Sequence, residues 1–347
     1  MVSAMKKEME MRKGIYRTLE FSTLYFGGGT PSVLDLEILH ELIDHAFKRY
    51  EFSVDPEITL EANPDDLTKD YLKGLKQMGF NRLSIGIQSF NESDLVLMRR
   101  SHTVEQAIYA IKNAQDAGFS NINIDLIYGI PGLKLANWEN NLNQAMDLNI
   151  QHISAYHLTF EPGTVFDLWK KKKRIIPVED ELSLAQFKIL KEVTGRNRFI
   201  HYEISNFAKD GFYSKHNSLY WNQVPYIGIG PSAHSFLKNE RRWNISHNKK
   251  YIEYLLHTDD KYYDTEELSK KDRYNEFVLT SLRTHKGIDL YRLGERFGDN
   301  YVKYTLDLAN CFLEKGDLIR TKNNIFLSEK GIMISDFIMR ELFILES

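Results

Sequence analysis

Residues that could bind a small polar ligand follow a series of short apolar runs in this sequence. The first group is "GGGT" at 27–30, where glycine's conformational freedom and missing side chain would let a ligand lie against the main chain. Carboxylates in later runs can accept hydrogen bonds from hydroxyl or ammonium groups. Each group taken singly is equally consistent with a tight turn or a helix cap. The residues concerned are Gly28, Gly29, Thr30, Glu61, Gln88, Asp125, Tyr156 and His157.

Strands that alternate with helices must position these residues. The β-rich runs predict strands at 22–26, 57–62, 82–89, 122–128, 152–159, 199–205 and 226–229. Helical periodicity predicts helices at 33–50, 69–78, 104–117, 137–148 and 180–193. This alternation is typical of an α/β fold with a parallel sheet, closed or partly closed. Because such sheets bind ligands at the carboxyl ends of their strands, we expect the polar residues to gather at one end.

Composition and charge narrow the class of protein. The chain has 347 residues, 42% of them hydrophobic, and a net charge of −3, which offers no general attraction to nucleic acid or an anionic membrane. The longest apolar runs are too short for a membrane-spanning helix and the N-terminus lacks a signal-peptide core, so we expect a cytoplasmic protein. A single cysteine, Cys311, leaves no internal disulfide and no cysteine cluster.

Four motifs together resemble those of a known family. "YFGGGTPS", "EANP", "GIQSF" and "NIDLIYGIPG", in this order, resemble the radical S-adenosyl-L-methionine (SAM) enzymes, in particular the oxygen-independent coproporphyrinogen III oxidases and their heme-chaperone relatives of the HemW branch. The resemblance implies a partial (β/α) barrel, similar to a TIM barrel, whose glycine loop binds the methionine end of SAM. Carried over by position, the SAM contacts would be Gly28, Gly29, Thr30, Glu61, Gln88, Arg100, Asp125 and Tyr156.

The sequence departs from the family at the iron–sulfur cluster. Family members hold a 4Fe-4S cluster with three cysteines spaced C-x-x-x-C-x-x-C, upstream of a helix that "MKKEMEMRKG" resembles. This sequence contains no such triplet, and Cys311 lies far away in its C-terminal part, so we expect no ligands for the cluster here. We expect the sequence to begin at an internal methionine of a longer protein; natural loss of the cysteine loop is the alternative.

One segment resembles the HemW branch rather than the oxidases proper. In "HNSLYW", a histidine beside aromatic residues could ligate iron and stack on a porphyrin. Packing at the end of the sheet is the alternative role for these side chains. The candidate heme-binding residues are His216, Asn217, Tyr220 and Trp221, with His157, His201 and His234 as rival ligands.

The predicted function is therefore that of a heme chaperone, which binds heme and transfers it to an acceptor hemoprotein. Oxidative decarboxylation of coproporphyrinogen III is the alternative that follows from the same family resemblance. A third alternative, a nucleic-acid-binding module rather than a heme protein or an enzyme, follows from the winged-helix-like order of elements in the C-terminal part.

Beyond residue 236 the strand–helix alternation stops. Helices are predicted at 270–282, 290–297, 301–314 and 329–342, with strands at 317–320 and 325–327. This order is winged-helix-like, so we expect a radical SAM barrel at 1–236 and a C-terminal domain, as in the oxidases, at 237–347. Acidic and basic residues are interspersed here, so we expect no nucleic acid partner. The one basic cluster, "WKKKKR", is predicted to be a solvated loop, with a protein partner or an acidic membrane surface as the alternative.

Overall fold

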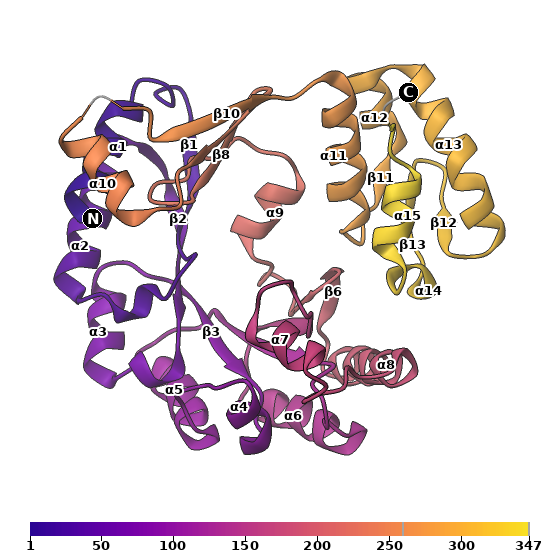
Figure 1. Ribbon diagram of the computed structural model, residues 1–347, viewed down its shortest axis with the longest axis horizontal. Coiled ribbons are helices and arrows are strands. Elements are labelled where there is room, and N and C mark those ends of the chain that lie inside the picture. The colour runs from indigo at the N-terminus through magenta and orange to yellow at the C-terminus, as the bar shows by residue number, and fades with distance from the viewer. Residues whose placement is uncertain (259, 346–347) are drawn as a thin grey trace. The chain divides into compact units, whose positions relative to one another are not determined.

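The computed structural model describes residues 1–258 and 260–345 (Figure 1). The chain forms two compact units, each assembled from separate stretches of sequence. The first unit comprises Met1–Ser22, Glu37–Pro56 and the chain from Ser214 onward. The second comprises Thr23–Leu36 and Glu57–Tyr213. The domain boundary predicted at residue 236 remains a prediction.

A seven-stranded sheet, most of which belongs to the second unit, has the order β1-β2-β3-β4-β5-β7-β6. Strands β2 to β5 pair in parallel, which confirms the predicted partial (β/α) barrel. Strand β7 pairs antiparallel with both β5 and β6, because a two-residue turn rather than a helix joins β6 to β7. The bounds are β1 Glu20–Phe26, β2 Glu51–Ala62, β3 Arg82–Gln88, β4 Ile122–Tyr128, β5 His152–His157, β6 Ile200–Glu203 and β7 Asn206–Ala208.

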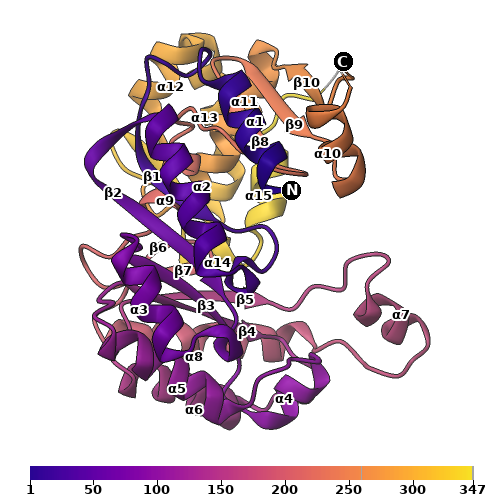
Figure 2. The same ribbon diagram turned by 90° about the vertical axis from the view of Figure 1, so that its left-hand side faces the viewer.

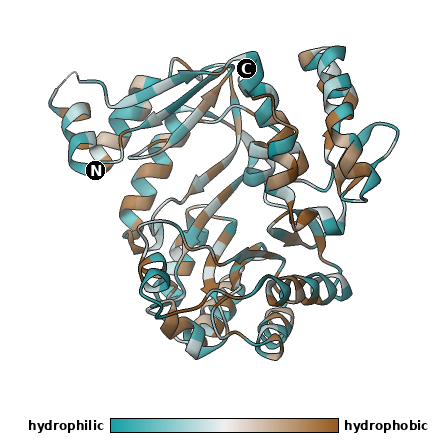
Figure 3. Ribbon diagram, turned by 45° about the vertical axis from the view of Figure 1, so that its right-hand side comes forward, coloured by the Kyte–Doolittle hydropathy of each residue, from teal (hydrophilic) through white to brown (hydrophobic). Residues whose placement is uncertain are grey.

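Five helices that alternate with these strands match the predicted ones to within three residues at each end, whereas α4 (Glu92–Leu97) and α7 (Val165–Lys171) were not predicted. Thr103 caps one of them through a capping box with Gln106, which explains why that helix begins at Val104. Hydrophobic and hydrophilic residues alternate along these helices, as amphipathic packing requires (Figure 3). The helices are α2 Leu36–Arg49, α3 Lys69–Gln77, α4 Glu92–Leu97, α5 Val104–Asp116, α6 Leu135–Asp147, α7 Val165–Lys171 and α8 Asp180–Arg196; two 3₁₀ turns lie at Pro31–Val33 and Pro64–Asp66.

The basic cluster lies on and just after α7, which stands apart from the other helices of its unit (Figure 2). Its five basic side chains, Lys170–Arg174, are all exposed, as expected of a solvated segment. Lys171 forms an ion pair with Asp167 at 2.7 Å. None of the helices in the described residues is long and apolar enough to cross a membrane.

A second sheet in the first unit was not foreseen from the sequence. It is antiparallel, with the order β10-β9-β8, and includes β8 His234–Leu237, β9 Glu240–Asn244 and β10 Tyr263–Glu267. These strands are short, and β9 and β10 are rich in charged residues, which are uncommon in strands, so the sheet gives a weak sequence signal. The strand predicted at 226–229 is wrong, since Tyr226 makes only an isolated bridge to Phe236.

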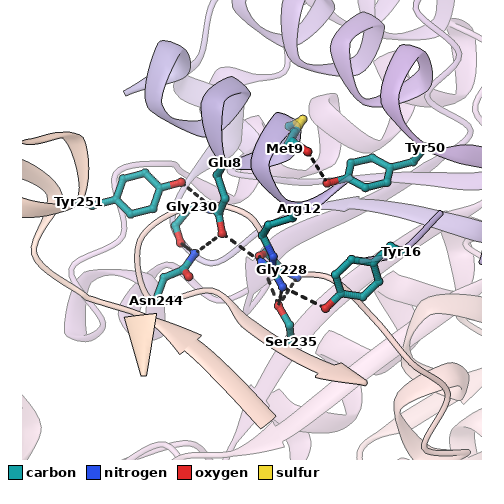
Figure 4. A network of polar contacts seen from close by, with 10 residues as sticks. All are labelled: Glu8, Met9, Arg12, Tyr16, Tyr50, Gly228, Gly230, Ser235, Asn244 and Tyr251. Carbon is teal, nitrogen blue, oxygen red and sulfur yellow. Dashed lines mark hydrogen bonds and ion pairs between the residues drawn. The ribbon is translucent and has the colours of Figure 1, made fainter. Parts of the chain in front are cut away.

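Helix α1 (Val2–Arg12) packs beside α10 (Asn248–Leu256), where Ala4, Tyr251 and Leu255 form a buried cluster. Helix α1 also carries a buried ion pair, Glu8 with Arg12 at 3.0 Å, whose side chains are 0% and 2% exposed (Figure 4). Polar groups from the segment after α1, from the β8–β9 region and from α10 bond to these charges, although the Arg12 Nε atom has no hydrogen-bond partner among the described residues. The partners are Asn244, Tyr251 and the Gly230 amide for Glu8, and Tyr16, Ser235 and the Gly228 carbonyl for Arg12.

The C-terminal part forms the predicted helices and hairpin, with one difference. Helices α11 (Lys270–Leu282) and α12 (Leu290–Phe297) have the predicted bounds. The predicted helix at 329–342 is instead two short helices, because Ile334 departs from helical geometry (φ −123°, ψ 28°). The other elements are α9 Lys215–Trp221, α13 Asp299–Glu314, α14 Glu329–Ile332, α15 Ser335–Glu341, β11 Ile288–Asp289, β12 Leu318–Arg320 and β13 Asn324–Leu327.

Candidate functional site

The glycine loop after β1 is tied to the neighbouring strand β2 by Glu61. The Glu61 carboxylate accepts hydrogen bonds from the Tyr25 hydroxyl at 2.7 Å and from the Gly28 amide at 3.2 Å. A Cβ atom at Gly27 would lie 2.8 Å from that carboxylate, so a side chain there would displace it. Gly28 has φ +83°, which other residues rarely adopt. Nothing lies within 4 Å of a Cβ placed on Gly28 or Gly29, so this backbone borders open space.

Gln88 and Arg100 meet at the end of β3. Gln88 has φ +66°, and a Cβ at Gly86 would lie 2.8 Å from its side-chain amide, so Gly86 makes room for that amide. The Arg100 guanidinium donates to the Asn63 side-chain oxygen at 2.8 Å and to the Gly86 carbonyl at 3.3 Å. Burial lowers the pKa of Arg100, whereas the charges of nearby aspartates oppose that shift. Arg100 thus holds a partly desolvated charge at this end of the sheet.

Asp125 lies inside the otherwise apolar strand β4. Its Oδ1 accepts a hydrogen bond from the Asn123 side-chain amide at 2.8 Å. Burial raises the pKa of Asp125 from 3.8 to about 6; the bond from Asn123 opposes this shift, and the charge of Glu61 adds to it. The carboxyl is therefore poised to change its charge in a physiological pH range.

Side chains behind Asp125 determine how Asn123 is oriented. The His152 Nδ1 and the Ser154 hydroxyl lie 2.5 Å and 3.1 Å from the Asn123 oxygen, and both are placed to donate to it. The other His152 nitrogen lies 2.7 Å from the Tyr202 hydroxyl. Burial lowers the pKa of His152 well below its usual value, so the ring is neutral. Sequence patterns gave no signal for His152 and Tyr202 as partners of Asn123, because both are distant from it in sequence. The pattern N-x-D in β4 was the only signal for Asn123 itself.

The structure brings the predicted SAM-site residues to one end of five neighbouring strands of the second unit. Hydrogen bonds link Gly28 to Glu61, and close approaches link Gln88 to Arg100 through Gly86. The Tyr156 side chain, on β5, is 45% exposed. Glycine backbone that borders open space, carboxylates and a guanidinium in one place suit a zwitterionic ligand that also carries hydroxyl groups. Whether SAM contacts these residues remains a prediction.

The heme-candidate segment forms α9 in the first unit, where Ser214 caps the helix by accepting from the Asn217 amide at 3.2 Å. The His216 ring meets the Tyr220 ring edge-on at 4.8 Å between centroids, and Tyr220 meets Tyr226 at 4.5 Å. The Trp221 indole N–H is buried and has no hydrogen-bond partner in the described structure. His216, Tyr220 and Tyr226 therefore form one aromatic group, and Trp221 follows Tyr220 at the end of α9.

The rival histidines lie in other surroundings. His157 bonds to the Ser183 hydroxyl at 3.0 Å, and His201 bonds to the Ile204 carbonyl at 3.0 Å while stacking on Phe207. Both rings belong to the second unit and already use one nitrogen. His234 is exposed near the Trp243 ring, 6.3 Å between centroids. Local structure therefore favours none of the three over His216 as part of an aromatic site.

A 4Fe-4S cluster does not fit the residues present. The one cysteine, Cys311, is exposed on α13. Within the described ranges, no group of three or more histidine, cysteine or acidic side chains could hold a metal ion. Three thiolates, the usual ligands, are not supplied by these 347 residues.

Comparisons with known proteins place these features in context. The Radical SAM superfamily matches residues 7–145, and the HemN C-terminal domain matches residues 268–334. The heme chaperone HemW of Bacillus subtilis is 33% identical over 95% of this chain and 88% of its own length. HemW of Lactococcus lactis is 31% identical over 93% and 85%. The structure of coproporphyrinogen III oxidase (HemN) from Escherichia coli superposes with a TM-score of 0.83 at 21% identity, covering 98% and 82%.

Proposed function

This chain belongs to the HemW family of radical SAM proteins, and from that premise we propose that it binds heme and transfers it to an acceptor hemoprotein. The observation that carries the proposal is the 33% identity to a heme chaperone over 95% of the chain. The family resemblance predicted from the four motifs is thereby confirmed. The HemN structure, at 21% identity, supports the fold alone.

Helix α9 is the proposed heme-binding element. Heme affinity comes from burying a large apolar macrocycle and from one or two axial bonds to iron. His216 supplies an imidazole, and Tyr220 and Trp221 supply aromatic surface on the same short helix. The heme site therefore needs no iron–sulfur cluster.

The second unit is proposed to hold SAM, the cofactor of the superfamily. The open backbone at Gly28 and Gly29 would receive its methionine end, and Arg100 would pair with its carboxylate. Glu61 and Asp125 would accept hydrogen bonds from its ammonium or ribose hydroxyl groups. A cluster would supply electrons to SAM when bound, but the present residues do not hold one.

Anaerobic reconstitution of these 347 residues with iron and sulfide is therefore expected to give no stoichiometric cluster. The chain has one exposed thiol, whereas the cluster needs three. Absorbance, iron content and the reduced-state EPR signal measure the outcome. A radical SAM protein with all three cysteines, treated in parallel, is the positive control. About one cluster per chain would contradict the expectation, and so would SAM cleavage by the reconstituted protein.

Location and partners are proposed on sequence grounds. We propose a cytoplasmic protein with heme and one hemoprotein as its partners, and no nucleic acid. The exposed basic segment at α7 is the proposed place for any peripheral membrane contact.

Heme titration tests the proposed function. Ferric heme is expected to give a saturable Soret shift near one per chain, and the loaded protein is expected to pass heme to an apo-hemoprotein. Replacing both His216 and Trp221 by alanine should weaken the complex or change its spectrum, while His234→Ala should leave it unchanged. An unaltered Soret band in the double variant would move the site to another histidine. Absence of saturable binding in the folded wild-type chain would overturn the proposal.

A further inference from the structure

Four arginines converge on the C-terminal end of α9. Arg273 and Arg283 come from α11 and its C-cap, and Arg292 and Arg296 from α12. These elements and α9 belong to the same compact unit, and α11 contacts α9 directly. The sequence gives no signal for this cluster, because successive arginines are 10, 9 and 4 positions apart and no motif marks them.

Direct contacts join three of these arginines to the aromatic segment. The Arg283 guanidinium lies over the Trp221 ring, 5.0 Å from its centroid. Arg292 donates to the Asn222 carbonyl at 3.1 Å, and Arg296 donates to the Gln223 side-chain oxygen at 2.6 Å. Asn222 and Gln223 follow α9 immediately. The guanidinium groups therefore surround the end of the segment that carries His216, Tyr220 and Trp221.

The positive charge of this cluster is not balanced by carboxylates. Across the part of the chain that the structure describes, none of the four arginines forms an ion pair with an acidic side chain. Acidic residues of the same helices are engaged elsewhere. Asp272 caps α11, Asp289 caps α12, Glu276 forms an ion pair with Arg241, and Glu295 accepts a hydrogen bond from Tyr291.

The arginines also repel one another in partly desolvated surroundings. Burial lowers the pKa of Arg296, and the nearby charges of Arg292 and Arg273 lower it further. Nε atoms of Arg273 and Arg283 are buried without a hydrogen-bond partner. Mutual repulsion and unused donors both cost free energy in the unliganded protein, and an anion placed among the guanidinium groups would relieve the repulsion.

We propose that this arginine cluster binds the propionate carboxylates of heme held beside α9. The inference rests on the proposed heme-binding function and adds the group that orients the macrocycle. Heme carries two carboxylates on one edge, and arginine binds a carboxylate through two parallel N–H···O bonds. Rings at Tyr220 and Trp221 would contact the apolar face, and the cluster would hold the charged edge. The porphyrin edge that bears the propionates thus points toward α11 and α12.

Esterified heme provides a direct test. Ferric heme and its dimethyl ester share the iron and the apolar face but differ in charge at the propionates. We expect wild-type protein to bind heme at least about tenfold more tightly than the ester, since each charge-assisted bond that is lost weakens binding by about tenfold or more. In the double variant Arg292→Gln/Arg296→Gln, this preference should fall to within about twofold. Dissociation constants come from Soret titrations of the 347-residue chain and its variants.

Controls separate charge from folding. Arg292→Lys/Arg296→Lys keeps both charges and should retain part of the preference. Arg320→Gln removes an exposed arginine on β12, outside the cluster, and should retain all of it. Circular dichroism and thermal melts establish that each variant is folded.

The outcomes distinguish this inference from the function on which it rests. If wild-type protein binds heme and its ester equally, or if the glutamine variant keeps the full preference, the cluster does not bind propionates and the heme-chaperone proposal stands. If neither ligand binds, the proposed function itself fails. Salt-dependent binding of duplex DNA that is lost in the glutamine variant, without a preference for heme over its ester, would show that the cluster binds phosphates instead.

Discussion

Replacing Glu8 by alanine is expected to lower the free energy of unfolding by about 3–5 kcal/mol, because it leaves the charge of Arg12 buried without its ion-pair partner. The Glu8 carboxylate accepts from Arg12 at 3.0 Å, Asn244 at 2.9 Å, the Gly230 amide at 3.0 Å and the Tyr251 hydroxyl at 2.5 Å. Truncation removes all four bonds at once. Urea unfolding followed by circular dichroism and tryptophan fluorescence measures the change.

A matched surface pair is the control. Lys6 pairs with Glu41 at 2.6 Å, but both side chains are partly exposed, so Lys6→Ala should cost no more than about 1 kcal/mol. The double variant Glu8→Leu/Arg12→Met removes both charges and should be more stable than Glu8→Ala. Equal stability of Glu8→Ala and Lys6→Ala would show that the buried pair does not hold α1 in place.

The affinity for SAM is expected to rise roughly tenfold between pH 5 and pH 7. Burial raises the pKa of Asp125 to about 6, so the carboxyl is mostly protonated at pH 5 and mostly ionised at pH 7. The ionised carboxylate accepts hydrogen bonds at both oxygens, whereas in the protonated form one oxygen carries a proton and acts as a donor. The raised pKa also means that ionising Asp125 disfavours the folded state, so its contribution to stability is fully present below pH 4 and is lost as pH rises through about 6.

Asp125→Asn isolates the titration because it preserves the shape of the side chain but not its charge. We expect this variant to bind SAM about tenfold more weakly at pH 7 and to show no pH dependence between pH 5 and pH 7. Calorimetry at several pH values gives the dissociation constants, and thermal melts over the same range check the fold. A pH slope that persists in Asp125→Asn would assign the titration to another group and remove Asp125 from the proposed SAM site.

The order of predicted strands and polar residues along the sequence was enough to predict which strand ends carry the candidate SAM site. Local patterns identify β4 and the helices α11 and α12 to the residue, because apolar periodicity and capping residues are encoded within each element. Parallel strands place their carboxyl ends together, so Gly28, Glu61 and Asp125 were predictable as neighbours. The hydrogen bond from the Gly28 amide to the Glu61 carboxylate shows that these two residues are neighbours.

The hydrogen-bond partners that tune these groups were not predictable in the same way. His152 orients Asn123, and Tyr202 bonds to His152, over separations of 29 and 50 residues. The small sheet β8–β10 has short strands, and two of them, β9 and β10, are rich in charged residues, as exposed loops are. This sheet forms because its strands pair with one another, and no single strand has a sequence pattern that predicts it.

By itself, the sequence determined the family, the partial barrel and the chemical types of residue available to SAM and heme, because motifs, periodicity and composition are local properties of the chain. Only the tertiary structure decided which distant groups contact the buried charges. Glu8 and Arg12 find their partners more than 200 residues away, at Gly228, Gly230, Ser235, Asn244 and Tyr251. The arginines of α11 and α12 likewise become a cluster beside α9 only when the helices pack. Burial strengthens such interactions and makes unpaired charges costly, and burial depends on the arrangement of the whole unit rather than on any one segment.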